Sequence, residues 1–259
     1  MAAMTIAVSP PPTLAQRGFS LIELAIVLFI VALLLGGMLL PLAGQQDIRS
    51  YGDTQKTLTE ARDALFGYAM ANDRLPCPAK DATTGVESLL SPGVCSNPYD
   101  GFFPAATVGL APIDASGYLL DGWGGESYNR VRYAISTANS NAFSTVSGMK
   151  TTGMTTLAPD LQICTTGPTP PNPTTCDTGK SLATDAVAVI YSLGKNAGTG
   201  GTSDDEKHNP NRLVTGDSAF VAADRVFVNA PQGTNFDDQM IWMSKSTLFN
   251  HLVAAGRLP

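Results

Sequence analysis

The sequence predicts an α+β protein, in which a long N-terminal helix packs on a mainly antiparallel β-sheet. One observation is an apolar run near the N-terminus that passes directly into an amphipathic stretch ending at Asn72. A second is a set of short strand-like runs that are separated by turns and have no helical crossover pattern between them. The third is composition: only 15% of residues are charged, and 25 Gly and 18 Pro favour a loop-rich β domain.

The apolar run extends from Phe19 to Leu40 and carries a single charge, Glu23. At about 1.5 Å of rise per residue, such a helix measures about 33 Å, and the hydrocarbon core of a bilayer is about 30 Å thick. We therefore predict one helix over residues 19–72, and its first half is predicted to be transmembrane.

The second half of this helix, residues 45–71, has apolar side chains at helical spacing, with charged residues between them. The predicted stripe that faces the sheet consists of Ile48, Tyr51, Leu58, Ala61, Leu65 and Tyr68. Pro76 and Pro78 follow Asn72 and indicate that the helix ends there.

Four later runs predict the other regular elements. Residues 131–135, 186–193, 224–229 and 239–244 are expected to be strands, and residues 247–253 a short C-terminal helix.

Glu23 is an anomaly, because an acid inside a membrane helix usually has a partner. If the chain were cut after Gly18, the new amino group of Phe19 would lie four residues before Glu23. A neighbouring copy, shifted along the axis of a fibre, would then present its amine to this carboxylate. The pattern indicates a device for assembly.

Gly18, Phe19 and Glu23, set before a long apolar run, resemble the signal of type IV prepilins and of type II secretion pseudopilins. The resemblance implies a pilin-like fold with a leader over residues 1–18, the helix over 19–72 and a globular domain over 73–259. It also implies that prepilin peptidase cuts between Gly18 and Phe19 and N-methylates Phe19, and that Glu23 is the docking acid.

The same resemblance implies the partners and the location of the protein. They are an inner-membrane assembly platform, other pilins and further copies of the chain in a homo-oligomeric filament. Before assembly, a single-pass protein would sit in the inner membrane with its domain in the periplasm, and afterwards in a periplasmic or extracellular filament. An ordinary signal anchor that happens to hold one Glu is the alternative explanation of the segment.

All four cysteines follow the apolar run: Cys77, Cys95, Cys164 and Cys176. An even number on the exported side favours disulfides, and proximity in sequence favours Cys77–Cys95 and Cys164–Cys176. A metal site competes, although no Cys-x-x-Cys pair occurs in the sequence.

The loop of residues 194–206 is rich in glycine and acids and follows the strongest predicted strand. It resembles the calcium loop of major pseudopilins, which implies Asp204, Asp205 and the carbonyl of Leu193 as candidate Ca²⁺ ligands. A solvated acidic loop is the alternative. Asp237 and Asp238, next to each other before a later strand, are interpreted as solvated turn residues.

The segment Asp121-Gly122-Trp123-Gly124 resembles a second element of major pseudopilins, in which proline usually stands where this chain has Gly122.

The net charge and the absence of catalytic motifs disfavour two classes of function, nucleic-acid binding and catalysis. The net charge of −6 and the lack of an evident basic face disfavour a nucleic-acid partner. No hydrolase, zinc-protease or phosphate-loop motif occurs, so we expect no enzyme and no cofactor other than the candidate Ca²⁺. The resemblance implies a structural subunit of a type IV pilus or pilus-like filament, either a pilin or a minor pilin. The alternatives are a type II secretion pseudopilin and, in another class, a signal-anchored periplasmic binding protein or enzyme.

Overall fold

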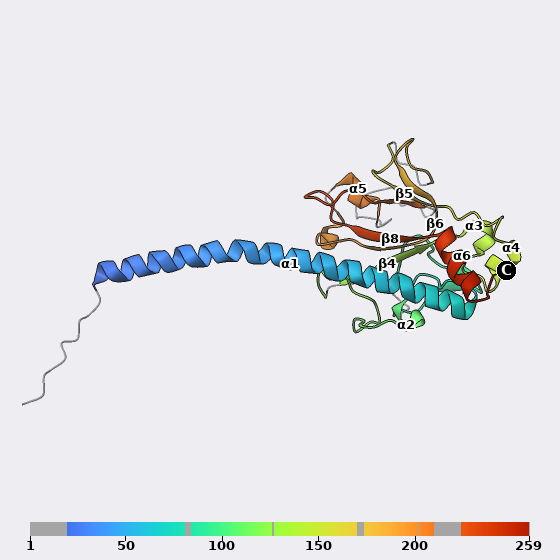
Figure 1. Ribbon diagram of the computed structural model, residues 1–259, viewed down its shortest axis with the longest axis horizontal. Helices are drawn as coiled ribbons and strands as arrows, with labels where there is room; N and C mark the ends of the chain where they lie inside the picture. The colour runs from blue at the N-terminus through green and yellow to red at the C-terminus, as the bar shows by residue number, and fades with distance from the viewer. Residues whose placement is uncertain are drawn as a thin grey trace, which may run out of the picture. The chain divides into compact units, whose positions relative to one another are not determined.

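The computed structural model divides the chain into two compact units, residues 1–46 and residues 47–259, which are described separately below. It describes residues 20–80, 84–125, 127–169, 174–201, 203–209 and 224–258, with side chains except at 37–43. One helix, α1 (Leu21–Asn72), supplies residues to both units (Figure 1). The predicted helix over residues 19–72 is thus confirmed from Leu21 onward, and Gly18 and Phe19 lie outside the described residues.

The described side chains include no helix that combines the length and the hydropathy required to cross a bilayer. The transmembrane first half of α1 therefore remains a prediction.

The second unit is built on a six-stranded sheet with the strand order β3-β4-β6-β5-β7, and β8 also pairs with β6. The strands are β3 (Gly101–Phe102), β4 (Arg132–Ile135), β5 (Leu161–Cys164), β6 (Ser181–Ser192), β7 (Val226–Val228) and β8 (Gln239–Ser244). A separate two-stranded sheet consists of β1 (Leu89–Ser91) and β2 (Val94–Cys95).

The remaining helices of the described residues are short. They are α2 (Ala105–Val108), α3 (Ala138–Asn141), α4 (Gly148–Thr152), α5 (Asp204–Lys207) and α6 (Lys245–Ala254), with 3₁₀ turns η2 (Ser127–Asn129) and η3 (Ala197–Thr199). The predicted C-terminal helix is confirmed as α6, and the four predicted strands are confirmed as β4, β6, β7 and β8. Most ends shift by one or two residues, but β6 begins at Ser181, five residues before its predicted start.

The prediction of a mainly antiparallel sheet is wrong, because the sheet is mixed. β5 and β7 pair in parallel, with Gln162 opposite Val226 and Cys164 opposite Val228. A parallel pair needs a connection that returns the chain to its starting end, and the sequence offered no crossover helix. Between β5 and β7, however, the chain contains β6, which runs antiparallel to β5 and provides the return.

β6 is the central strand of the sheet. Its residues from Ala186 to Ser192 are all buried, and this stretch pairs with both β4 and β8. Ile190, for example, lies opposite Tyr133 of β4 and Ile241 of β8. A continuous run of β-branched and apolar residues suits a strand that is covered on both faces.

Within the second unit, α1 packs on the sheet through Leu58, Ala61 and Leu65, which are fully buried (Figure 1). Burial of each leucine contributes about 2 kcal/mol. The earlier part of the predicted stripe does not join the core, because Ile48 is 74% exposed and Tyr51 39% exposed.

Two disulfides close the loops of the domain, Cys77–Cys95 and Cys164–Cys176. This is the pairing that proximity in sequence favours. The first links the segment after α1 to β2, and the second links the end of β5 to the loop that precedes β6. Because each closes a short loop of the unfolded chain, each is expected to stabilise the fold by about 3 kcal/mol.

Candidate functional site

The first candidate region is the start of α1, where Ser20 and Glu23 form a reciprocal pair of hydrogen bonds. The backbone N–H of Ser20 donates to Oε2 of Glu23 at 2.9 Å, and the backbone N–H of Glu23 donates to Oγ of Ser20 at 3.2 Å. This is a capping box, which satisfies two backbone donors that the first turn of a helix leaves without intrahelical acceptors. The Ser-x-x-Glu spacing explains why the helix begins at Leu21.

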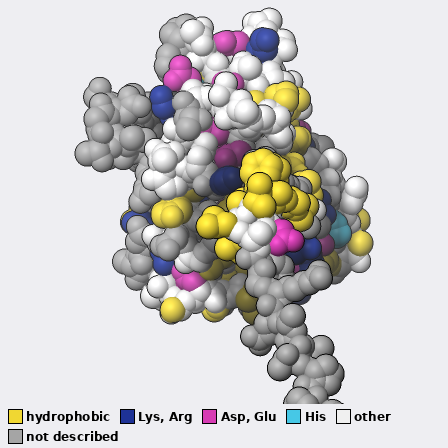
Figure 2. All heavy atoms as spheres, turned by 90° about the vertical axis from the view of Figure 1, so that its left-hand side faces the viewer, with side chains coloured by type: hydrophobic (Ala, Val, Ile, Leu, Met, Phe, Trp, Pro, Cys, Tyr) yellow, Lys and Arg dark blue, Asp and Glu magenta, His cyan; other side chains and the backbone are white. Residues whose placement is uncertain are grey.

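Behind this first turn, α1 is covered with exposed apolar side chains. They are Leu21, Ile22, Leu24, Ile26, Val27, Leu28, Phe29, Ile30, Val31, Leu33, Leu34 and Leu35. Figure 2 shows hydrophobic side chains gathered on the face that is turned toward the viewer. Exposed apolar surface of this extent indicates a surface that contacts protein or membrane.

The second candidate region is a group of three carboxylates, Glu206, Asp237 and Asp238, that lies near the end of β6. One carboxylate oxygen from each lies within 4.8 Å of the others. Glu206 and Asp238 are each only 1% exposed. The fold brings these acids together from α5 and from the turn before β8, two segments that are about 30 residues apart in the sequence.

Polar partners hold these acids in place. Oε1 of Glu206 accepts a hydrogen bond from the backbone N–H of Asp237 at 2.9 Å, and the Asn196 side chain donates to both Glu206 oxygens at 3.1 Å. Asn209 donates to Oδ2 of Asp238 at 2.6 Å. Asn209 also bonds the backbone of Val228 in β7 through both its amide oxygen and its amide nitrogen.

The electrostatics of the group follow from burial and from charge of one sign. Burial raises the pKa of the Asp238 carboxyl well above its usual value. Burial, and then the nearby Glu206 carboxylate, also raise the pKa of Asp237. Within the described part of the chain, Oδ1 of Asp237 is buried and has no hydrogen-bond partner. A bound cation would stabilise the ionised carboxylates and would give this oxygen a partner.

The structure places the predicted calcium acids elsewhere. The side chain of Asp204 is 98% exposed and pairs with Lys207, while Oδ1 of Asp205 accepts the backbone N–H of Gly167. Neither belongs to the group of three carboxylates. Leu193, which directly precedes the loop of residues 194–206, is buried, and its role as a carbonyl ligand stays a prediction.

Two features of this region were not predicted from the sequence: the burial of Asp237 and Asp238, and the capping box that Ser203 and Glu206 form. The interpretation of Asp237 and Asp238 as solvated turn residues is wrong, because Asp238 is buried and Asp237 is half-buried. A local signal did exist for Glu206: it is the fourth residue of Ser203-x-x-Glu206, a capping box that starts α5. The same spacing at Ser20 and Glu23 was also readable from sequence.

The loop that begins at Asp121 attaches the end of β6 to α1. Asp121 accepts hydrogen bonds from the Ser192 hydroxyl and from the Trp123 backbone N–H. The N–H of Gly122 donates to the Thr54 side chain at 2.9 Å, and a Cβ at Gly122 would lie 2.3 Å from the Ser50 carbonyl oxygen. A proline here would lose that donor and collide with α1, which explains why this chain has glycine.

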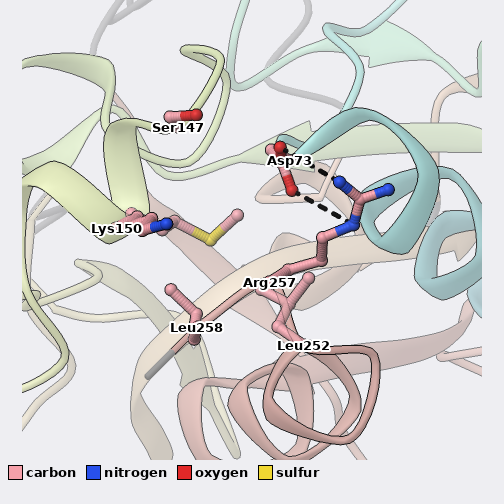
Figure 3. A pocket seen from close by; sticks show the side chains of 7 residues that line it. Asp73, Ser147, Lys150, Leu252, Arg257 and Leu258 are labelled. Atoms are coloured by element: carbon pink, nitrogen blue, oxygen red, sulfur yellow. Dashed lines mark hydrogen bonds and ion pairs between the residues drawn. The ribbon is translucent and has the colours of Figure 1, made fainter.

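A small pocket lies where the C-terminal segment meets the end of α1 (Figure 3). Asp73 and Arg257 form an ion pair in it at 3.5 Å, and Lys150, Ser147 and Leu252 also line it. Its volume of about 10 Å³ is close to that of one water molecule, so it offers no room for a small-molecule substrate.

Comparison with known proteins gives one match. Neither the curated proteins nor the solved structures include a significant match. Residues 14–39, which contain Gly18, Phe19, Ser20 and Glu23, match the family model of the prokaryotic N-terminal methylation motif. This chain therefore carries the prepilin-type signal of type IV pilins and pseudopilins.

Proposed function

We propose that this protein is a structural subunit, a pilin or minor pilin, of a type IV pilus or a pilus-like filament. The observation that carries the proposal is the methylation motif at residues 14–39, followed by a helix that exposes apolar side chains along its first turns. A signal of this kind points to a structural pilin-like protein that is processed by prepilin peptidase and assembles with other pilins.

In this proposal the peptidase hydrolyses the peptide bond between Gly18 and Phe19 and methylates the new amine of Phe19. The apolar first half of α1 then holds the subunit in the inner membrane, with the disulfide-closed domain in the periplasm. At the assembly platform, the first half of α1 packs against the same segment of other subunits. Glu23 meets the amine of a neighbour, and this pairing sets the axial position of each subunit.

Intact-mass analysis and N-terminal sequencing of the membrane-extracted protein test the processing step. We expect a chain that starts at N-methylated Phe19. A Gly18→Leu variant serves as the control and should keep residues 1–18. An intact leader on the unaltered chain, in cells that contain an active prepilin peptidase, would contradict the proposal.

The second candidate is a type II secretion pseudopilin, and one specific observation favours it. Glu206 and Asp238, which are buried, and Asp237, which is half-buried, provide hard oxygen ligands of the type that Ca²⁺ prefers. Among the described residues, Oδ1 of Asp237 has no hydrogen-bond partner. We propose that these three residues hold Ca²⁺, in place of Asp204 and Asp205. The bound ion would offset two of the three negative charges and connect the loop after β6 to the turn before β8.

Thermal unfolding of the chelator-treated protein, with and without added Ca²⁺, tests this site. At a Ca²⁺ concentration of 100 times Kd, a specific site adds about 2.7 kcal/mol to the free energy of unfolding. Asp238→Asn should abolish this gain, whereas Asp204→Asn in the same loop should keep it. Equal gains in both variants would show that the three carboxylates do not bind the ion.

A further inference from the structure

The capping box at the start of α1 gives Glu23 a partner within its own chain. Its Oε2 accepts the N–H of Ser20, the residue directly after Phe19. Its own N–H is satisfied in turn by the Ser20 hydroxyl. The acid that looked unpartnered in sequence is therefore already hydrogen bonded in a single subunit.

The atoms that form this box are not altered by processing. Hydrolysis between Gly18 and Phe19 changes the Phe19 nitrogen, and methylation adds a carbon to the same nitrogen. The box uses the backbone nitrogens of Ser20 and Glu23, the Ser20 hydroxyl and the Glu23 carboxylate. It can therefore exist in the precursor and in the processed subunit alike.

The box also fixes where the carboxylate lies. A side chain at the third helical position that folds back onto the cap residue is held over the first turn, next to the chain end that processing creates. A carboxylate has two oxygens and accepts several hydrogen bonds, so the bond to Ser20 leaves capacity for an ammonium group. An acid with an internal donor is also less costly to carry in an apolar environment.

We propose that Ser20 is a positioning residue for Glu23. Through the capping box it starts α1 at Leu21, keeps the Glu23 carboxylate hydrogen bonded before assembly, and presents it at the helix end to the amine of a second copy of this chain. This inference rests on the proposed role of Glu23 as the docking acid, and it adds the residue that orients that acid.

Amide hydrogen exchange of the processed full-length protein in detergent micelles tests the box without any assembly step. We expect Ser20→Ala to speed exchange of the Glu23 amide about fivefold, the size expected for loss of an N-cap. Ser20→Thr and Ser20→Asn, which retain a capping side chain, should preserve protection. Ser203→Ala is the matched control, because it removes the same cap from α5 and should leave the Glu23 amide unchanged.

If Ser20→Ala is not cleaved, the same exchange is measured on the precursors of both proteins, because the box uses the same atoms there. An unchanged Glu23 amide in Ser20→Ala would overturn the proposal in either form.

Incorporation into filaments provides the second readout. Among cleaved and methylated variants, we expect incorporation to follow capping ability: Ser, Thr and Asn high, and Ala and Gln reduced about fivefold. Equal incorporation of Ser20→Asn and Ser20→Gln would refute the positioning role, because both are polar amides and only Asn is a good cap.

These experiments distinguish a failure of the inference about Ser20 from a failure of the proposed docking role of Glu23. If Glu23→Gln assembles normally, Glu23 is not the docking acid, whatever the exchange data show. If Glu23→Gln fails to assemble while the Ser20 series has no effect, docking stands and the inference about Ser20 is wrong.

Discussion

Two Ser-x-x-Glu segments begin helices in this chain, and they differ in what surrounds them. Ser20 and Glu23 start α1, while Ser203 and Glu206 start α5, and both pairs make the same two reciprocal hydrogen bonds. Glu206 is buried and also bonds Asn196 and Asp237 of its own domain. Glu23 is exposed in the single chain. The same local motif is completed by tertiary contacts in one case, and we propose that it is completed by another subunit in the other.

The largest expected difference between the two boxes is in the stability of the domain. Glu206→Ala removes the acceptor for the Ser203, Asn196 and Asp237 donors, all of which are partly buried. We expect a loss of about 4 kcal/mol in the free energy of unfolding, measured by urea denaturation in detergent. Glu23→Ala should leave the unfolding of the domain unchanged. Similar losses in both variants would show that Glu23 supports the stability of the domain as much as Glu206 does, which contradicts this expectation.

The stability of the domain should also depend on pH, because of the buried Asp121. Burial raises the pKa of Asp121 to about 6, despite the hydrogen bond from Ser192. The pKa of Asp121 in the folded protein lies above the value of about 3.9 in the unfolded chain. The contribution of Asp121 to the free energy of unfolding is therefore fully present below about pH 3.9 and is lost as pH rises through about 6. This loss amounts to about 3 kcal/mol. Thermal unfolding of Asp121→Asn between pH 4 and 7 should show a flatter profile, and an unaltered profile would be inconsistent with a titrating Asp121.

The smallest effect is expected from the cap alone. Ser203→Ala should lower the free energy of unfolding by about 1 kcal/mol, because the N–H of Glu206 loses its acceptor. Ser203→Thr retains the hydroxyl and should stay close to the unaltered protein. The shift of the thermal midpoint measures both. A loss in Ser203→Ala as large as that in Glu206→Ala would mean that the cap, and not the surrounding network, holds Glu206.

Periodic patterns predicted the long elements well. Leu58, Ala61 and Leu65 recur at the spacing of a helix face, and all three are fully buried in α1. The run around Ile190 is apolar on both faces, and it became the central strand β6. Such patterns work because burial of one face dominates the energy of a long element.

Contacts between distant segments were not predictable in the same way. β5 has only four residues, and its parallel partner β7 lies about 60 residues later. The turn around Asp237 and Asp238 predicts solvated side chains, yet the residues that bond them, Glu206 and Asn209, come from the segment after β6. No local pattern encodes which loop covers a given turn.

We propose that Glu23 forms, with another subunit, the kind of polar contact that its counterpart Glu206 forms within the chain. The most direct measurement is the abundance of Glu23→Gln subunits in purified filaments, relative to their abundance in the membrane. Glu60→Gln is the control, because Glu60 is an exposed acid on the same helix, paired only with Lys56 one turn away in the contacts described. We expect Glu23→Gln to be inserted and cleaved normally but depleted from filaments at least tenfold, while Glu60→Gln is not depleted. Equal abundance of the two variants in filaments would contradict the proposal.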